Sequence, residues 1–364
     1  MPDKFPRIQK QEKVEMLKLN RTMHWLVGAA LLGAQVASLA HGDHGSSATV
    51  LAQASGAANP AAAAAPVAGG QVATVKMEVK SVAPNVYYVQ GLSALGSPAN
   101  QNFISNAGFV VTDDSVVVID ALGSPALAEE LVQKIKAITP KPISTVILTH
   151  YHADHIYGLQ VFKDLGAKII ANAQAREYLN SDTARLRLEA SRTELAPWIN
   201  ASTHMVNADE WIAQDAVKHT IGGTEFVLQH MGPAHTPEDT AVFLPKSGVL
   251  FIGDVVFRNR IPYVGQADSR HWITALDALL KLPVKVMVPG HGPASEDPRG
   301  DMQLTRDYLS YLRESMAKAA QNLDPFDDAY KATDWSKFEG YPLFKEANRM
   351  NAYNTFLLME QEKP

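Results

Sequence analysis

The sequence predicts an α/β fold in which β-sheets are covered by helices. Along most of the chain, runs of β-branched residues alternate with segments whose apolar residues recur at helical spacing. Of the 364 residues 46% are hydrophobic, which is enough to bury the core of one large domain or two smaller ones.

The composition excludes several classes of function. A formal net charge of -5 offers no basic face to nucleic acid, so we expect a small-molecule substrate as the partner and no nucleic acid. The chain has no cysteine, which rules out disulfides, cysteine nucleophiles and thiolate metal ligands. Any bound metal must therefore be held by nitrogen and oxygen.

The N-terminal segment, residues 1–40, predicts a secretory signal. Lys18 precedes an apolar run that ends in small residues, and Ser38 and Ala40 fit a cleavage site. This favours a periplasmic or secreted protein that crosses a membrane only in passing. An uncleaved N-terminal membrane anchor is the alternative, and Met16 is a second candidate start of translation.

Residues 41–74 are rich in Ala, Gly and Pro and predict a flexible linker. Although His41 and His44 could meet a metal ion, histidines in a disordered linker are poor ligands, and we leave both outside the site.

The first elements after the linker are strands. We expect one at 85–92 and a hairpin over 102–121, in which two β-rich runs flank an Asp-Asp turn. A helix is predicted over 124–139, with a serine cap and a proline at its first position.

A second strand–helix–strand unit follows. A buried strand over 143–149 ends just before His150, a short helix covers 157–166, and the next strand covers 167–172. The polar stretch 173–200 is predicted to be helical.

The remaining pattern divides the folded part into two regions. We assign a catalytic domain to 75–300 and a helical C-terminal extension, whose role stays open, to 301–364. Further strands are expected at 222–231, 240–254 and 284–292, and helices at 269–282 and 302–323, before a loosely structured end.

The stretch "THYHADH" after the strand at 143–149 is the strongest sign of chemistry. In His150-x-His152-x-Asp154-His155, alternate positions point the same way, so the first two histidines can hold one ion while the following pair turns toward another. Side chains this costly to desolvate are rarely crowded together without a positive charge between them. A hydrogen-bonded histidine cluster is the structural alternative.

Three residues downstream complete the pattern. His235 lies in the loop "GPAHTPED", Asp254 follows "LFIG", and His291 follows "MVPG", so that rigid strands end in candidate ligands. The other seven histidines have no partner spacing: His24, His41, His44, His204, His219, His230 and His271.

Together these residues resemble the metallo-β-lactamase-fold hydrolase superfamily over about residues 80 to 295. The resemblance implies an αββα sandwich of two facing mixed β-sheets with outer helices, and a two-metal site at one sheet edge. It implies that His150, His152 and His235 hold the first metal, that Asp154, His155 and His291 hold the second, and that Asp254 bridges both. Two Zn²⁺ are the expected cofactors, with iron or manganese compatible with the same ligands.

The resemblance also implies a mechanism. A metal-bridging hydroxide attacks a carbonyl of a lactam, lactone, ester or thioester, and Asp154 helps to move the proton. No covalent protein nucleophile is needed.

The resemblance points to more than one class of substrate. "GPAHTPEDTAVFLP" and "VPGHG" resemble the zinc (class B) β-lactamases, which makes a β-lactam the most specific single expectation. Asp254 stands where those enzymes carry a metal-binding cysteine, and His155 stands where they usually carry a residue that is not a ligand. Both features instead resemble glyoxalase II, lactonases and the broader hydrolase branches. Tyr263 stands where many lactamases have an asparagine.

Substrate contacts are expected from the loop after Asp254. Arg258 or Arg260 can bind a carboxylate through the guanidinium, or be exposed loop arginines. The walls of the site are expected at 181–204 and 258–268.

Two other functions stay open. The first is an iron-dependent oxidoreductase of the same fold, similar to persulfide dioxygenases, and the second is a noncatalytic metal-binding protein. Bound iron with oxygen consumption would favour the first. The sequence does not decide the oligomeric state.

Overall fold

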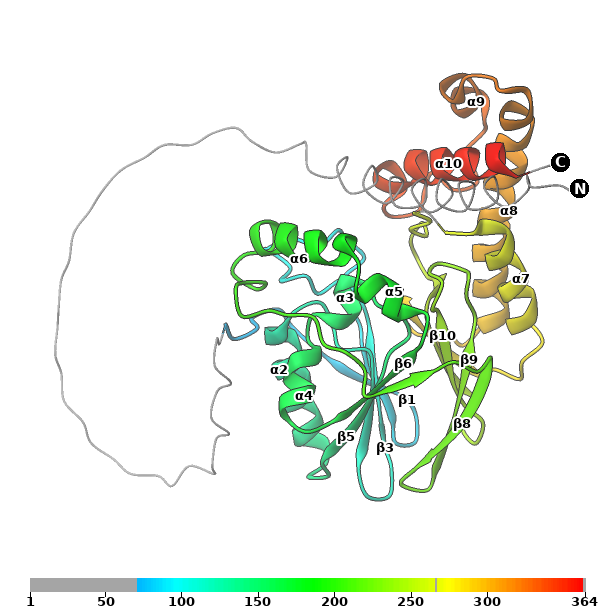
Figure 1. Ribbon diagram of the computed structural model, residues 1–364. Helices are drawn as coiled ribbons and strands as arrows, with labels where there is room; N and C mark the ends of the chain where they lie inside the picture. Colours follow the sequence, from blue (N-terminus) through cyan, green and yellow to red (C-terminus); the bar gives the residue numbers. More distant parts are fainter. Residues whose placement is uncertain (1–70, 266, 363–364) are drawn as a thin grey trace, which may run out of the picture. The chain divides into compact units, whose positions relative to one another are not determined.

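The computed structural model describes residues 71–265 and 267–362, which form two facing β-sheets with helices on their outer sides (Figure 1). This arrangement confirms the predicted αββα sandwich. The predicted signal segment and nearly all of the linker, including Met16, His24, His41 and His44, lie outside the described residues.

The first sheet has seven strands in the order β1 to β7. Neighbours from β1 to β4 are antiparallel and those from β4 to β7 are parallel, so the sheet is mixed. The strands are β1 (Val79–Ala83), β2 (Val86–Val89), β3 (Ala107–Val111), β4 (Val116–Ile119), β5 (Ile143–Ile147), β6 (Lys168–Asn172) and β7 (Glu210–Ile212).

The second sheet has five strands in the order β12-β11-β10-β9-β8. The pair β11–β12 is parallel and the other pairs are antiparallel. The strands are β8 (Ala216–Ile221), β9 (Thr224–His230), β10 (Thr240–Leu244), β11 (Val249–Phe257) and β12 (Val286–His291).

Helices cover both outer faces. Helix α2 begins as predicted, because the Ser124 hydroxyl accepts a hydrogen bond from the Leu127 amide and a proline occupies the first turn. The helices are α2 (Pro125–Ile138), α3 (Ala153–Ile156), α4 (Leu159–Asp164), α5 (Ala175–Leu179), α6 (Asp182–Glu194), α7 (Ser269–Leu279), α8 (Pro298–Asn322), α9 (Phe326–Ala332) and α10 (Phe344–Gln361).

Three apolar clusters hold the layers together. One lies between the sheets, where Ile147 and Val117 of the first sheet face Phe251 and Val242 of the second. A second packs α2 and α4 against the first sheet. The third packs α7, α8 and α10 against the second sheet, so the C-terminal helices share a core with the strands that carry part of the site.

Several expectations were incomplete or wrong. Strands β1, β7 and β8 were not predicted, and the end of the chain is not loosely structured, because α9 and α10 form there. Asp254 does not end its strand: β11 continues to Phe257. The pairing with β12 shifts on both sides of Gly253, whose φ of 54° marks the irregularity.

Among the described residues, no helix combines the length and the apolar character needed to cross a membrane.

Candidate metal centre

The sheet edge beyond β5 carries the motif that begins at His150. The chain leaves the strand, and His152 becomes the N-cap of the short helix α3, which carries Asp154 and His155. Tyr151, between the two histidines, is fully buried and donates its hydroxyl to the Val206 carbonyl at 3.2 Å. Because successive side chains of an extended segment point to opposite sides, His150 and His152 point away from the Tyr151 side chain, toward the second sheet.

All seven predicted residues come together in two groups. The first group contains His150, His152, His235 and Asp254, and the second contains Asp154, His155 and His291. Within each group, one ligand atom from every residue lies within 4.8 Å of the others. The four motif residues follow strand β5 of the first sheet. Asp254 and His291 lie in β11 and β12 of the second sheet, and His235 lies in the loop between β9 and β10, so the site joins the two sheets.

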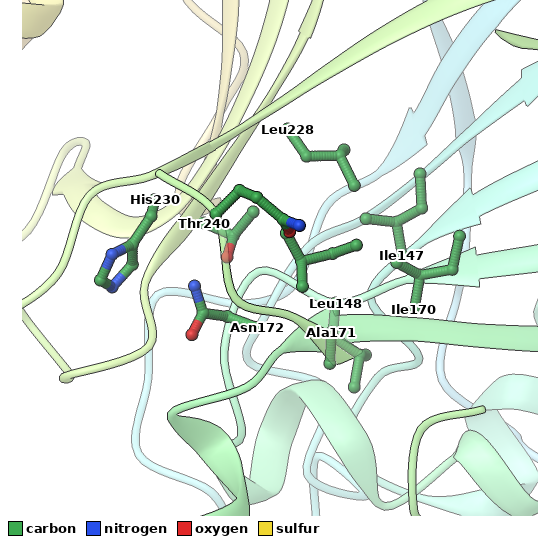
Figure 2. Close-up of a pocket in the computed structure, with 10 residues that line it drawn as sticks. Ile147, Leu148, Ile170, Ala171, Asn172, Leu228, His230 and Thr240 are labelled. Atoms are coloured by element: carbon green, nitrogen blue, oxygen red, sulfur yellow. The ribbon is translucent and has the colours of Figure 1, made fainter. Parts of the chain in front are cut away.

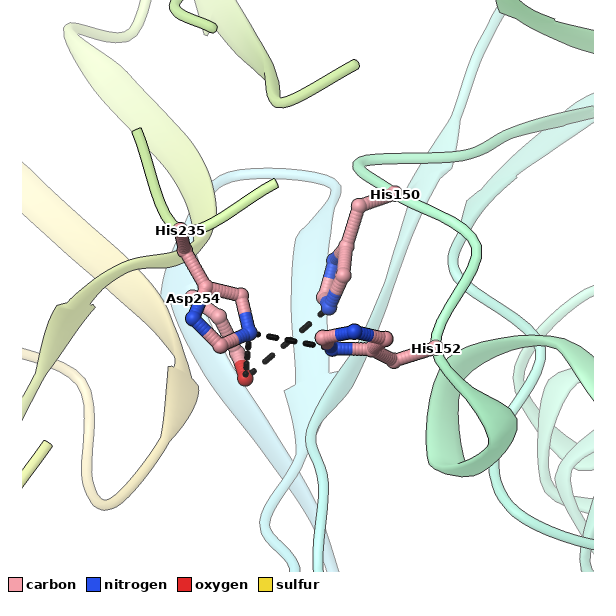
Figure 3. Close-up of side chains that lie close together, drawn as sticks. All are labelled: His150, His152, His235 and Asp254. Carbon is pink, nitrogen blue, oxygen red and sulfur yellow. Dashed lines mark hydrogen bonds and ion pairs between the residues drawn. The ribbon is translucent and has the colours of Figure 1, made fainter. Parts of the chain in front are cut away.

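Asp254 lies between the two groups. In the first group, its Oδ2 is 3.5 Å from His235 Nε2 and 3.9 Å from His150 Nε2 (Figure 3). In the second group, Oδ2 is 3.2 Å from His291 Nε2 and Oδ1 is 3.4 Å from His155 Nε2. The carboxylate is 5% exposed, so water does not replace these neighbours.

The donor atoms fit metal ions. Nitrogen or oxygen ligands about 2.0–2.1 Å from a tetrahedral zinc are about 3.3 Å apart from one another. The separations of 3.2 to 3.9 Å around Asp254 match that spacing. Moreover, among the described residues, His150 Nε2, His155 Nε2 and Asp254 Oδ1 are buried without a hydrogen-bond partner. Most buried polar atoms are paired, so a cluster of unpaired atoms indicates a missing positive centre.

The electrostatics of the cluster favour cations. Burial lowers the pKa of His150 well below its usual value and lowers that of His235 to about 3, so both imidazoles are neutral and keep a lone pair. Burial alone would lower the pKa of His155, but the nearby carboxylates, Asp154 foremost, raise it. Burial opposes ionisation of Asp154, yet His155 and other imidazoles hold its pKa below the usual range. The carboxylate is therefore ionised.

Asp120 fixes the orientation of His155. Its carboxylate accepts hydrogen bonds from His155 Nδ1 at 2.9 Å, and from the amide and hydroxyl of Thr149 at 2.8 Å each. With Nδ1 donating, Nε2 of His155 faces Asp254 and Asp154, where a metal ion would replace its proton. Sequence reasoning missed Asp120, although its place directly after the buried strand β4, beside β5, was a usable signal.

The end of β12 is held in the same manner. His291 Nδ1 is 2.7 Å from the Ile104 carbonyl, and the Asn106 amide donates to the carbonyls of Pro289 and Gly292 at 2.7 Å each. Asn106, fixed beside β12 in this way, also escaped prediction, since nothing in the local sequence marks it as a partner of β12.

The strands β11 and β12 approach one another closely at Gly290. A Cβ atom at this position would lie 1.9 Å from Asp254 Oδ1. Only glycine leaves room for the carboxylate there.

Arg260 lies against the second group of ligands. It is 8% exposed, its guanidinium nitrogen NH1 is 3.4 Å from His291 Nδ1, and its guanidinium covers the Phe257 ring at 5.4 Å. Phe257 in turn stacks on His291, with 5.3 Å between ring centres. In the described part of the chain, the contacts of the Arg260 guanidinium are the Ile261 carbonyl and these two rings, none of which is a carboxylate.

The two other residues expected to meet the substrate differ from one another. The ring of Tyr263 lies 6.3 Å from that of His235, at the site. Arg258 instead pairs with Asp301 of α8 at 2.8 Å and donates to the Ala294 carbonyl at 2.7 Å. These contacts engage Arg258 in holding α8.

The remaining described histidines lie outside the cluster. His271 pairs with Asp268 at the start of α7, His219 faces Glu210, and His204 contacts the Ser202 carbonyl. His230 contacts the Pro237 carbonyl at 2.8 Å. In the described residues, none of these four histidines belongs to a group of three or more side chains that could hold a metal ion.

A separate small cavity lies between the sheets. Figure 2 shows apolar residues of β5 and β6, such as Ile147 and Ile170, opposite Leu228, with Asn172, His230 and Thr240 also along the lining. Its volume is about 240 Å³ with the solvent at its mouth included, and none of the seven predicted ligands lines it. It is therefore distinct from the candidate metal centre.

Comparison with known proteins agrees with this geometry. The sequence model described as "Metallo-beta-lactamase superfamily" matches residues 101–291. Metallo-beta-lactamase IND-1 of Chryseobacterium indologenes is 27% identical over 52% of this chain and 73% of its own length. A linear primary-alkylsulfatase of Pseudomonas sp. is 23% identical over 56% of this chain and 45% of its own length.

The fold is also found in solved structures. The sec-alkylsulfatase Pisa1 from Pseudomonas sp. aligns with a TM-score of 0.61 and 18% identity, covering 78% of this chain and 50% of that one. The chain thus spans about half the length of the alkylsulfatases that it matches. Because the family match covers more than half of the chain, this protein belongs to the metallo-beta-lactamase superfamily. That superfamily includes hydrolases, and the described His/Asp cluster could hold metal ions.

Proposed function

We propose that the protein is a hydrolase that uses two divalent metal ions, zinc being favoured, to cleave a substrate that carries a carbonyl group and a negative charge. The observation that carries this proposal is the set of buried ligand atoms on His150, His155 and Asp254 that have no hydrogen-bond partner among the described residues. When bound there, the metal ions would lower the pKa of a water molecule and polarise the scissile bond.

The side chains of the site would divide the work. Asp254 would hold both metal ions, because its carboxylate faces both groups of ligands. Asp154 lies 3.3 Å from His291, and its side chain is 17% exposed, against 5% for Asp254. This more open carboxylate can accept the proton of the attacking water and deliver it to the leaving group.

Arg260 supplies the expected recognition of negative charge. Its guanidinium is buried beside His291 and has no carboxylate partner among its described contacts. An anionic group of the substrate would pair with it and compensate the cost of the buried charge. Burial lowers the pKa of Arg260, but Asp254 and Asp154 oppose the shift, and the group stays cationic.

A β-lactam is the most specific substrate that we propose. It contains a strained amide and a carboxylate. Metallo-beta-lactamase IND-1, which matches this chain over 73% of its own length, is a β-lactamase. The predicted signal segment agrees with a periplasmic or secreted location, where such compounds are met.

Sulfate ester hydrolysis is the second candidate. The alkylsulfatase Pisa1 covers 78% of this chain, and a sulfate ester would present its negative charge to Arg260 as a lactam carboxylate would. The bond broken would differ, but the requirement for a metal-activated water would be the same.

The test is a pair of assays on the zinc-loaded protein, with a chelated sample as the control. Chelator-sensitive hydrolysis of a chromogenic cephalosporin supports the β-lactam proposal, whereas hydrolysis of a nitrophenyl sulfate or an alkyl sulfate supports the second candidate. Bound iron together with oxygen uptake would instead identify an oxidoreductase. A zinc-loaded protein inert toward lactams, lactones, esters, thioesters and sulfate esters would overturn the hydrolase.

A further inference from the structure

The loop between β11 and α7, described over residues 258–265, forms a wall of the metal centre. It carries Arg260, which lies against His291, and Tyr263, which faces His235. The position of this loop decides where a substrate meets charge and an aromatic ring.

Contacts from the C-terminal helices hold this loop. Arg258, at its start, pairs with Asp301 in the first turn of α8. The Ile261 amide donates to the Pro342 carbonyl, just before α10, at 3.0 Å.

The third and most specific contact is made by Asn351 of α10. Its side-chain amide nitrogen donates to the Pro262 carbonyl at 2.7 Å, and its side-chain oxygen accepts from the Val264 amide at 2.9 Å. These two bonds flank Tyr263 on both sides. Asn351 is fully buried, so no water competes for either group.

A hydroxyl of α8 in turn orients the Asn351 amide. Its nitrogen also donates to the Tyr308 hydroxyl at 2.9 Å, and Tyr308 donates to Asn348 at 2.9 Å. A chain of hydrogen bonds therefore runs from the centre of the C-terminal helices to the site loop.

We propose that Asn351 is a positioning residue for the metal centre, and that the C-terminal extension thereby takes part in substrate selection. Asn351 touches no metal ligand; it acts through the backbone on either side of Tyr263 and through the loop that carries Arg260. The effect on substrate rests on the proposed function, whereas the effect on the loop does not.

Asn348 provides a matched control. It is also a fully buried asparagine of α10 and also bonds to Tyr308, but its second bond goes to the Tyr330 hydroxyl of α9 at 3.1 Å, away from the loop. Asn348→Ala and Asn351→Ala should therefore lose similar stability, but Asn348→Ala should affect the metal centre less, because Asn348 reaches the loop only through Tyr308 and Asn351.

The first measurement is amide hydrogen exchange of the peptide containing residues 258–265, in the zinc-loaded full chain. Asn351→Ala should exchange at least about tenfold faster there than the wild type, whereas Asn348→Ala, which loses no bond to the loop itself, should show a much smaller increase. Asn351→Asp keeps the acceptor for the Val264 amide but loses the donor to Pro262, so its exchange should be intermediate. Unchanged exchange in Asn351→Ala would overturn the proposal.

The second measurement is steady-state kinetics with whichever anionic substrate the wild type cleaves. Asn351→Ala should raise KM on the order of tenfold with a smaller change in kcat, and Asn348→Ala should change neither by as much. Equal changes in both variants would reduce Asn351 to a structural role. If the wild type cleaves nothing, the proposed hydrolase fails, and the exchange measurement alone still decides whether Asn351 fixes the loop.

Discussion

Asp254 is the residue on which both groups of ligands depend. Its carboxylate faces His150 and His235 on one side and His155 and His291 on the other. No other residue of the cluster faces both sides, so its loss should affect both groups of candidate ligands at once.

We therefore expect Asp254→Ala to lower the affinity for zinc by at least about a hundredfold and to abolish hydrolysis in a folded protein. His152→Ala should do the same at the first group. Metal analysis after dialysis, together with circular dichroism, checks both variants. His230→Ala, which removes a histidine outside the cluster, is the control; wild-type zinc content in Asp254→Ala would contradict the assignment.

Asp120 allows a more selective test, because it contacts His155 without facing the metal centre. In Asp120→Asn, an amide NH₂ placed toward His155 Nδ1 would favour the proton on Nε2, and that nitrogen could no longer bind a metal. We expect a loss of zinc affinity of about 10–100-fold, the usual effect of replacing a residue that hydrogen-bonds to a metal ligand. Zinc titration with a competing chelator measures it, and the exposed Asp164→Asn serves as the control.

Gly290 tests the close approach of β11 and β12. Gly290→Ala would push a methyl group into Asp254 Oδ1 and should reduce metal binding as strongly as a ligand substitution does. Gly340→Ala is the matched control, because nothing lies within 4 Å of a Cβ at that position. If Gly290→Ala bound zinc as tightly as Gly340→Ala does, β12 would be able to move away from Asp254 without weakening the metal site.

At the scale of elements, α10 is bound to the body of the protein by Phe356, which is 4% exposed in the cluster that also holds Trp272 and Tyr308. We expect Phe356→Ala to lower the free energy of unfolding by about 3 kcal/mol, a usual cost for emptying such a position. Urea unfolding measures the change, and the exposed Glu360→Ala should leave the midpoint unchanged. A loss below about 1 kcal/mol would mean that α10 is loosely held.

The sequence pattern explains why some elements were predicted and α10 was not. Strand β5 and helix α2 have clear apolar periods and, for α2, a capping serine. In α10 the buried face itself carries Asn348, Asn351 and Thr355, so polar residues occupy positions where a helix normally shows its apolar stripe. Their partners lie far away in sequence, which no local pattern can reveal.

The metal centre was predictable for a related reason. Four of the candidate ligands directly follow the recognisable strand β5 at short spacings, and the seven residues predicted from the sequence are the seven that the structure brings together. Asp120 and Asn106 were missed because they act through backbone and imidazole groups brought close only by the fold. The path of the loop 258–265 was likewise hidden, since Asn351 fixes it from almost ninety positions later in the chain.

For the whole molecule, metal ions that join the two sheets should stabilise the fold. At a free zinc concentration about a hundred times the Kd, each bound ion contributes about 2.7 kcal/mol, which corresponds to a Tm increase on the order of 5 °C per ion. Differential scanning calorimetry with and without a chelator measures the shift. Asp254→Ala should show almost no chelator effect, and an equal chelator effect in that variant would place the stabilising metal elsewhere.

The positions of the candidate ligands along the chain determine the order in which they become available during synthesis. His150 emerges from the ribosome long before His291, and the first sheet alone supplies only the four motif residues. A nascent chain that has not yet reached residue 291 cannot complete the second group. A metal ion held by both groups would therefore require that the chain has reached residue 291 and that the two sheets have closed on one another.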